Sequence, residues 1–165
     1  MRRAFALLSL LLLAIPIALF AKGRTVRIVI DGGDLAAPIE ISDKTLVDSI
    51  VVGRGPGNFS ARGPVIYDHG FIVQWSRGEA AAPPSLRTYN VSFVTTRTDK
   101  STYIVRYAID PATNQGYVLI PGKDDPAYPD NTWMILRGVE GKWFYAWSEW
   151  EKFAHPLIEK APKKN

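Results

Sequence analysis

The sequence contains no cysteine, and this absence excludes several classes of protein. Disulfide frameworks, thiol enzymes and metal sites built from thiolates are all excluded. A lipid-anchored bacterial precursor also needs a cysteine just after its apolar segment, so that form of export is excluded as well. The folded domain must therefore be held together by a hydrophobic core. Aromatic residues make up 12% of the chain, with 5 Trp and 7 Tyr, which is enough to build one.

A strong excess of charge of either sign is also missing. The formal net charge is +4, from 20 basic and 16 acidic residues. Two of the basic residues, Arg2 and Arg3, belong to the N-terminal segment, which leaves 18 basic against 16 acidic residues. Outside the tail at 160–164 no basic cluster exists, so we expect no nucleic-acid partner. A chain of 165 residues with 22% charged residues indicates one globular domain.

The N-terminus has the pattern of a secretory signal peptide. Two arginines precede an apolar stretch at 4–13 that only one serine interrupts, and Pro16 then breaks the helix. Residues 18–21 end in alanine and precede a polar segment. We therefore predict a signal peptide over residues 1–21 and export of the remainder to the periplasm or the exterior.

An uncleaved membrane anchor is the alternative interpretation of this segment. A spanning helix needs roughly 20 apolar residues, and residues 4–21 nearly reach that length. Pro16 favours cleavage, whereas Leu19 matches the cleavage motif less well than alanine would. Contact with a membrane is expected only if the segment is retained.

The mature chain is predicted to be mostly β-strand. Apolar residues alternate with polar ones in several segments, with Val26, Ile28 and Ile30 as the first example. The predicted strands are residues 25–30, 38–41, 71–76, 89–96, 102–109, 116–120, 132–137 and 142–147. The last two are expected to form a hairpin with each other.

Two helices are predicted among these strands. Ser42 would cap a short internal helix at 43–52. Ser148 and Glu151 have the spacing of a capping box and would start a C-terminal helix, which Pro156 would bend or end near Ala154.

We therefore predict an α+β fold with an antiparallel sheet of about six to eight strands, one short internal helix and a C-terminal helix. The single domain would span residues 25–160, followed by a frayed basic tail at 161–165.

The hairpin of 89–96 and 102–109 allows a prediction of register. Both strands have one strongly apolar face, made by the odd-numbered residues. Residues directly opposite in an antiparallel pair point to the same side of the sheet, so odd positions must oppose odd positions. The predicted pairs are Phe93 with Tyr103, Val91 with Val105 and Tyr89 with Tyr107, around a three-residue loop at 97–99.

Three segments resemble motifs of uncharacterised exported bacterial proteins. They begin with Gly33-Asp34-Leu35 and Pro38-Ile39-Glu40-Ile41-Ser42-Asp43, continue with Gly116-Tyr117-Val118 and Pro121-Gly122, and end with Glu140-Gly141-Lys142-Trp143-Phe144. The resemblance spans most of the mature chain and implies a shared fold and export. It implies no known activity and no functional residue.

The most unusual stretch is the aromatic row at 142–147. On a strand, Trp143, Tyr145 and Trp147 share one face and Phe144 lies on the other. Flat aromatic rows bind sugars, because the rings stack on the apolar faces of sugars. Packing of the row in the core is the commoner fate of aromatic residues and is the interpretation we favour.

An acidic loop is the second candidate site. It contains Asp124, Asp125, Asp130 and Asn131. Its spacing does not fit a calcium loop, so a solvated loop is the favoured interpretation. The two isolated histidines, His69 and His155, do not supply the ligands of a zinc site. We expect no metal, no other cofactor and no catalytic motif.

Two functions remain open. We favour a non-enzymatic binding module of the bacterial envelope or exterior, contacting a protein or a polysaccharide through the aromatic row and the acidic loop. The alternative is a hydrolase that uses a carboxylate pair such as Asp124 and Asp130. Such a pair needs a separation of about 5–10 Å and a raised pKa in one carboxyl.

The signal-peptide prediction has a direct test. Mass spectrometry of the exported protein should find a mature N-terminus close to Lys22, because cleavage is expected after Ala21. Recovery of the full-length chain in the membrane fraction would instead support a retained anchor.

Overall fold

The structure is a computed structural model that describes residues 24–50, 59–60, 63–64, 69–81, 86–96, 101–131 and 138–164. The predicted signal peptide lies outside these residues and stays a prediction. No helix in the described ranges is both long and apolar enough to span a membrane.

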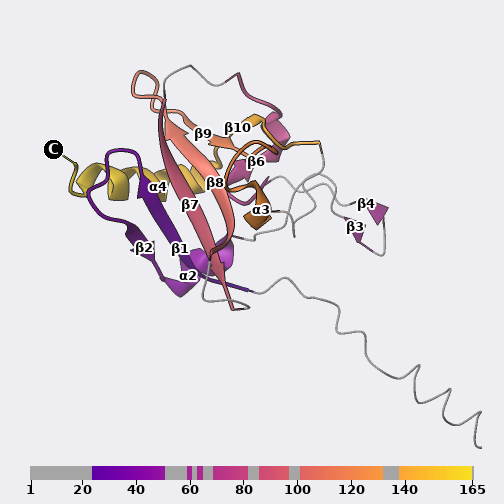
Figure 1. Cartoon of the computed structure of the whole chain (residues 1–165), viewed down its shortest axis with the longest axis horizontal. Coiled ribbons are helices and arrows are strands. Elements are labelled where there is room, and N and C mark those ends of the chain that lie inside the picture. Colours follow the sequence, from indigo (N-terminus) through magenta and orange to yellow (C-terminus); the bar gives the residue numbers. More distant parts are fainter. Residues whose placement is uncertain are drawn as a thin grey trace, which may run out of the picture.

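Strands dominate the described elements, as predicted (Figure 1). The strands are β1 (Thr25–Gly32), β2 (Ile39–Ile41), β3 (Phe59–Ser60), β4 (Gly63–Pro64), β5 (His69–Gly70), β6 (Val73–Gln74), β7 (Arg87–Thr95), β8 (Ser101–Ile109), β9 (Gly116–Leu119) and β10 (Trp143–Tyr145). The helices are α2 (Lys44–Ser49), the 3₁₀ turn η1 (Trp75–Arg77), α3 (Tyr128–Asn131) and α4 (Ser148–Lys160).

Six strands of the described segments form one antiparallel sheet in the order β10-β9-β8-β7-β1-β2. The smaller pairs β3–β4 and β5–β6 lie outside it. The predicted α+β fold with an antiparallel sheet, a short internal helix and a C-terminal helix is confirmed.

The central pair β7–β8 has the predicted register. Its Cα partners include Phe93 with Tyr103, Val91 with Val105 and Tyr89 with Tyr107, and all six side chains are buried. Towards the loop the register shifts, so that Val94 lies opposite Ser101. The predicted turn at 97–99 lies outside the described residues.

The predicted alternation of buried and exposed residues in β1 is wrong at the start of the strand. Ile28 and Ile30 are fully buried, but Val26 is 45% exposed. Thr25 lies opposite Thr95 and Arg27 opposite Val94, so Val26 is the extra residue of a β-bulge. A bulge reverses the face on which the preceding residues lie, which explains why Thr25 is buried instead.

The predicted strand at 71–76 is also wrong. The chain reverses at Phe71 and Ile72, and β5 pairs with β6 in a two-residue hairpin. Phe71 has a φ of 59°, a conformation that costs energy for a bulky residue. Its ring is buried edge-on against Phe93 and Tyr103, so core packing offsets the cost.

The partner of β10 differs from the predicted one. Residues 132–137 lie outside the described ranges, while β10 pairs with β9 on one side. On the other side, Ala80 donates its N–H to the carbonyl of Trp143 (2.8 Å). Glu79 and Phe144 are backbone partners there in an isolated antiparallel β-bridge. Segments 79–80 and β9 therefore occupy the two edges of β10, and the predicted hairpin with 132–137 lies outside the described residues.

The internal helix is shorter than predicted and has a different cap. α2 ends at Ser49, and Asp43 rather than Ser42 is its N-cap. The Asp43 carboxylate accepts the N–H of Leu46 at 2.9 Å. A carboxylate is favoured at this position, because it satisfies a free helical N–H and lies at the positive end of the helix.

The C-terminal helix starts at the predicted residue but without the predicted capping box. Trp147 is the N-cap of α4, and no side chain caps the helix. Glu151 turns away from Ser148 and contacts the sheet. The helix also continues through Pro156 to Lys160 instead of ending near Ala154. Pro156 is exposed, and burial of Ile158 beyond it favours continuation despite the lost backbone hydrogen bond.

The core lies between the sheet and α4, which crosses one of its faces (Figure 1). The helix contributes Trp150, Ala154 and Ile158, which are spaced four residues apart and are at most 2% exposed. The Trp150 ring meets the Tyr107 ring edge-on, with centroids 5.8 Å apart. The central strands and the helix thus form one continuous core.

The C-terminal tail is not frayed as far as residue 164, contrary to the prediction. Ala36 donates its N–H to the carbonyl of Pro162 (2.9 Å), and Lys164 donates to the carbonyl of Asp34 (2.7 Å). The Asp34 carboxylate also lies 2.5 Å from Arg87 and 3.4 Å from Lys163. Backbone pairing and charge together hold the tail beside the turn after β1.

Asn131 completes the edge of β8. The paired stretch of β9 reaches only to Arg106, so β9 offers no partner to Ile104 on that side. The Asn131 side chain accepts the N–H of Ile104 (2.8 Å) and donates to its carbonyl (2.6 Å). A buried amide thereby replaces one residue of a strand.

Replacing this amide should destabilise the fold. We expect Asn131→Ala to lower the free energy of unfolding by about 1–3 kcal/mol, because the N–H of Ile104 loses its partner. Chemical denaturation measures the loss, and amide exchange of Ile104 should accelerate. Asp130→Ala is the control, since Asp130 is exposed next to it. Equal stability of the two variants would contradict the role of Asn131.

Candidate functional site

A groove of about 550 Å³ lies between α2 and the start of α4. Its α2 side is lined by Asp43, Thr45, Leu46 and Ser49, and its α4 side by Trp147, Glu149, Lys152 and Phe153. The apolar surface comes from one indole, one phenyl ring and one leucine, and the other lining residues are polar or charged. The groove therefore combines an aromatic surface with a hydrogen-bonding rim.

Trp147 reaches this groove because the chain leaves the sheet just before it. Ala146 bridges to Val73, and Trp147 donates its backbone N–H to the carbonyl of Ile72 at 2.7 Å. Trp147 then becomes the N-cap of α4. The His69 ring stacks on one face of the indole, with centroids 4.3 Å apart and planes at 6°. This stacking holds the indole in a fixed orientation.

The ionic groups of the rim are already engaged within the protein. Lys152 lies 2.6 Å from the Glu149 carboxylate, and the Asp43 carboxylate caps α2. The Ser49 hydroxyl donates to the carbonyl of Leu46 at 2.6 Å. Hydrogen bonds and ion pairs within the protein therefore already orient the rim side chains. Less side-chain entropy would be lost when a ligand binds.

The predicted aromatic row is divided by the fold. Phe144 is buried in the core, whereas Trp143 and Tyr145 lie on the opposite face of the sheet, paired with Leu119 and Tyr117 of β9. The favoured interpretation, in which the row packs in the core, is therefore wrong for Trp143 and Tyr145. Trp147 lines the groove instead. All three residues of the row are half-buried, so neither core nor open surface describes them.

Tyr145 has an aromatic and a cationic neighbour. Its ring lies 5.7 Å from that of Tyr117, and the guanidinium carbon of Arg77 sits 3.6 Å from its centroid. Arg77 also donates to Gln115 at 3.0 Å. One face of Tyr145 is therefore occupied by a cation–π contact.

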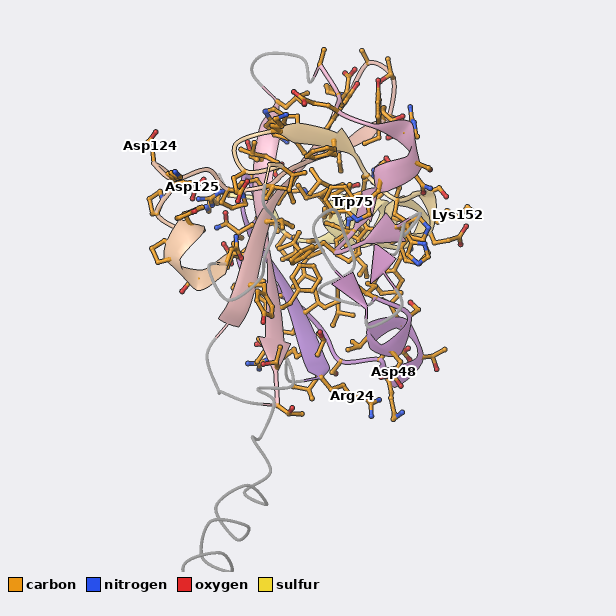
Figure 2. All side chains as sticks on the ribbon, turned by 90° about the vertical axis from the view of Figure 1, so that its right-hand side faces the viewer. Arg24, Asp48, Trp75, Asp124, Asp125 and Lys152 are labelled. Atoms are coloured by element: carbon orange, nitrogen blue, oxygen red, sulfur yellow. The ribbon has the colours of Figure 1, made fainter. Side chains whose placement is uncertain are left out.

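The acidic loop does not form a cluster. Asp124 is exposed and points away from the domain in Figure 2, and Asp130 is exposed as well. Asp125 is engaged, because it lies 2.9 Å from Arg106 and accepts the N–H of Ala127 at 2.8 Å. Burial opposes its charge, but these bonds outweigh burial and lower the pKa of Asp125.

The acidic loop and the groove lie on opposite sides of the domain, as Asp124 and Lys152 show in Figure 2. They do not form one surface. Within the described ranges, no group of three or more His, Asp or Glu residues could hold a metal ion.

Sequence reasoning missed a buried polar cluster at the sheet–helix contact. The Glu151 carboxylate accepts the backbone N–H of Gly116 at the start of β9. It also lies 3.9 Å from Nε2 of His155, one turn further along α4. An added Cβ at Gly116 would collide with this carboxylate and come within 3.0 Å of Ala146. Gly116 is therefore required for the contact.

Burial shifts the pKa values of both ionisable groups towards their neutral forms. It raises the pKa of Glu151, although the N–H of Gly116 and the charge of Arg77 partly oppose the shift. Burial lowers the pKa of His155, against the opposing charge of Glu159. Burial and the nearby Glu151 also raise the pKa of Tyr107. The cluster is thus most stable when uncharged.

A sequence signal for this cluster does exist. Glu151 and His155 are four residues apart, directly beside the apolar stripe of Trp150, Ala154 and Ile158. Residues at the flank of such a stripe are carried towards the core. Glu151 fits both the capping-box pattern and this flanking pattern. It was assigned to the capping box, so the flanking pattern was missed.

The raised pKa of Glu151 predicts a pH-dependent stability. A raised folded pKa means that its contribution is fully present below the unfolded value of 4.5 and is lost as the pH rises through the folded value. Glu151→Gln keeps the acceptor for Gly116 without a charge. The variant should therefore gain stability relative to the wild type as the pH rises above 4.5, the unfolded value.

Denaturation of both proteins across this range measures the difference. The aspartates with lowered pKa contribute equally to both and cancel. A stability difference that does not change with pH would show that Glu151 is not held neutral.

Comparison with known proteins identifies no relative. No protein-family model matches the chain. No curated protein and no solved structure is similar enough to indicate kinship. The resemblance to exported bacterial proteins therefore stays a prediction, and the function has to be argued from the site.

Proposed function

We propose that this chain is an exported, non-enzymatic binding module that takes a polysaccharide segment into the groove between α2 and α4. The observation that supports this is the position of Trp147, an oriented indole in a groove with hydroxyl and carboxylate groups at its rim. Export is proposed from the signal-like N-terminus.

The chemistry of the groove suits a sugar better than a purely apolar ligand. Sugar rings present apolar C–H faces and a perimeter of hydroxyl groups. The indole of Trp147 and the phenyl ring of Phe153 supply apolar area, and Thr45 and Glu149 supply polar atoms. A volume of about 550 Å³ falls in the usual range for ligand sites, roughly 300–1,000 Å³.

The orientation of the Trp147 ring, which the protein fixes without a ligand, also supports binding. The ring of His69 stacks on one face of Trp147, which leaves the rest of the indole for a ligand. The proposed contact is the groove face of this ring. Trp143 and Tyr145, which the sequence grouped with Trp147, are not part of this surface.

The carboxylate-pair hydrolase is not favoured. A general acid for glycoside hydrolysis needs an environment that raises its pKa, which burial supplies. Asp124 and Asp130 are both exposed. We therefore place no catalytic step on the acidic loop.

Substitution of Trp147 tests the proposed function. Binding of a tetramer of N-acetylglucosamine and of soluble peptidoglycan fragments is measured by calorimetry on the wild type. Trp147→Ala should weaken binding about 5- to 12-fold, because loss of one aromatic contact costs about 1–1.5 kcal/mol. Trp143→Ala is the matched control, a half-buried indole outside the groove.

Three results would contradict the proposal. The wild type binds none of the polysaccharide probes, or Trp147→Ala binds them as well as the wild type does, or both variants lose affinity equally. Near-ultraviolet circular dichroism of each variant establishes that the fold is retained before binding is compared.

A further inference from the structure

Three buried polar atoms at the sheet–helix contact have no hydrogen-bond partner among the residues that the structure describes. They are the hydroxyl of Tyr107, Nε1 of Trp150 and Nε2 of His155. Tyr107 and Trp150 are fully buried, and His155 is 9% exposed. Buried polar groups are almost always hydrogen-bonded, so three such atoms require an explanation.

The three side chains are neighbours. The ring of Tyr107 lies 5.8 Å from that of Trp150 and 6.2 Å from that of His155, measured between centroids. Tyr107 therefore connects the other two, on the strand side of the contact. All three rings lie in the interior, between β8 and α4.

We propose that Tyr107, Trp150 and His155 form a binding site for a buried water molecule at the contact between β8 and α4. Buried waters make about three hydrogen bonds to polar groups that otherwise have no partner. The number and nature of the atoms here match that requirement. The site is independent of the groove and of the proposed function.

The donor and acceptor pattern selects water. The indole N–H of Trp150 is only a donor, the hydroxyl of Tyr107 is both donor and acceptor, and neutral His155 accepts at one ring nitrogen. Water accepts from Trp150 and donates to His155, with Tyr107 in either role. The indole donor disfavours a cation, and an apolar guest would leave all three atoms unpaired.

An anion is the remaining alternative, and the surroundings disfavour it. Trp150 and Tyr107 could both donate to chloride, but His155 would have to be protonated to join them. Burial lowers the pKa of His155 and so keeps it neutral.

A crystal structure of the full chain, at a resolution that shows ordered water, tests the site. We expect a water within hydrogen-bond distance of at least two of the three atoms. A second crystal soaked in sodium bromide separates water from an anion. An anomalous bromide peak at the site would overturn the proposal, as would direct hydrogen bonds among the three side chains or absence of density.

Two variants identify the ligands of the water. Tyr107→Phe removes one hydrogen-bonding partner, so the water should be lost or displaced. Tyr89→Phe is the matched control, because its hydroxyl already donates to Asp34 at 2.9 Å and lies outside the site. The water should persist in this control. An unchanged water in Tyr107→Phe would remove Tyr107 from the site, and the wild-type crystal decides the case if that variant fails to fold.

Discussion

The register between β7 and β8 determines which side chains reach the core, and the other layers are built against that choice. With odd residues opposite odd residues, both apolar faces point towards α4. A slip by one residue would place the large side chains of one of the two strands on the opposite face. β1 and β9 extend the sheet from this pair, and Trp150 of α4 packs against Tyr107 at its centre. The pairing of two strands thus positions the helix that carries the candidate groove.

The same helix shows a conflict between local and tertiary interactions. A capping box would have bonded Glu151 to the start of its own helix, at the surface. Instead its carboxyl contacts Gly116 and connects α4 to the start of β9. In this contact the acidic group loses water, and this desolvation raises the pKa of Glu151. Attachment of the helix to the sheet outweighs that cost, because one contact then fixes the position of two elements.

Local alternation was sufficient to predict most strands, the two helices and the central register. Predictions failed where a distant segment decided the outcome. The bulge at Val26 and the reversal at Phe71 depend on pairing and packing that alternation does not contain. Likewise, β10 has partners that are 24 to 28 residues away in sequence, at Tyr117–Leu119, and 63 to 65 residues away, at Glu79–Ala80. Of the candidate site, sequence identified Trp147 but not its neighbours, because the groove is made by α2, whose position relative to α4 is a tertiary property.

The two ends of the large sheet bear on how the protein behaves when concentrated. An open strand edge invites pairing with another chain and so aggregation. At one end, residues 79–80 already hydrogen-bond to β10. At the other, β2 has only three residues, follows Pro38, and carries the exposed Glu40, whose carboxylate lies 3.1 Å from Arg27. A short, charged edge beside a proline is a poor template for strand addition. Both ends of the sheet therefore offer little free backbone to another chain, although no disulfide restrains them.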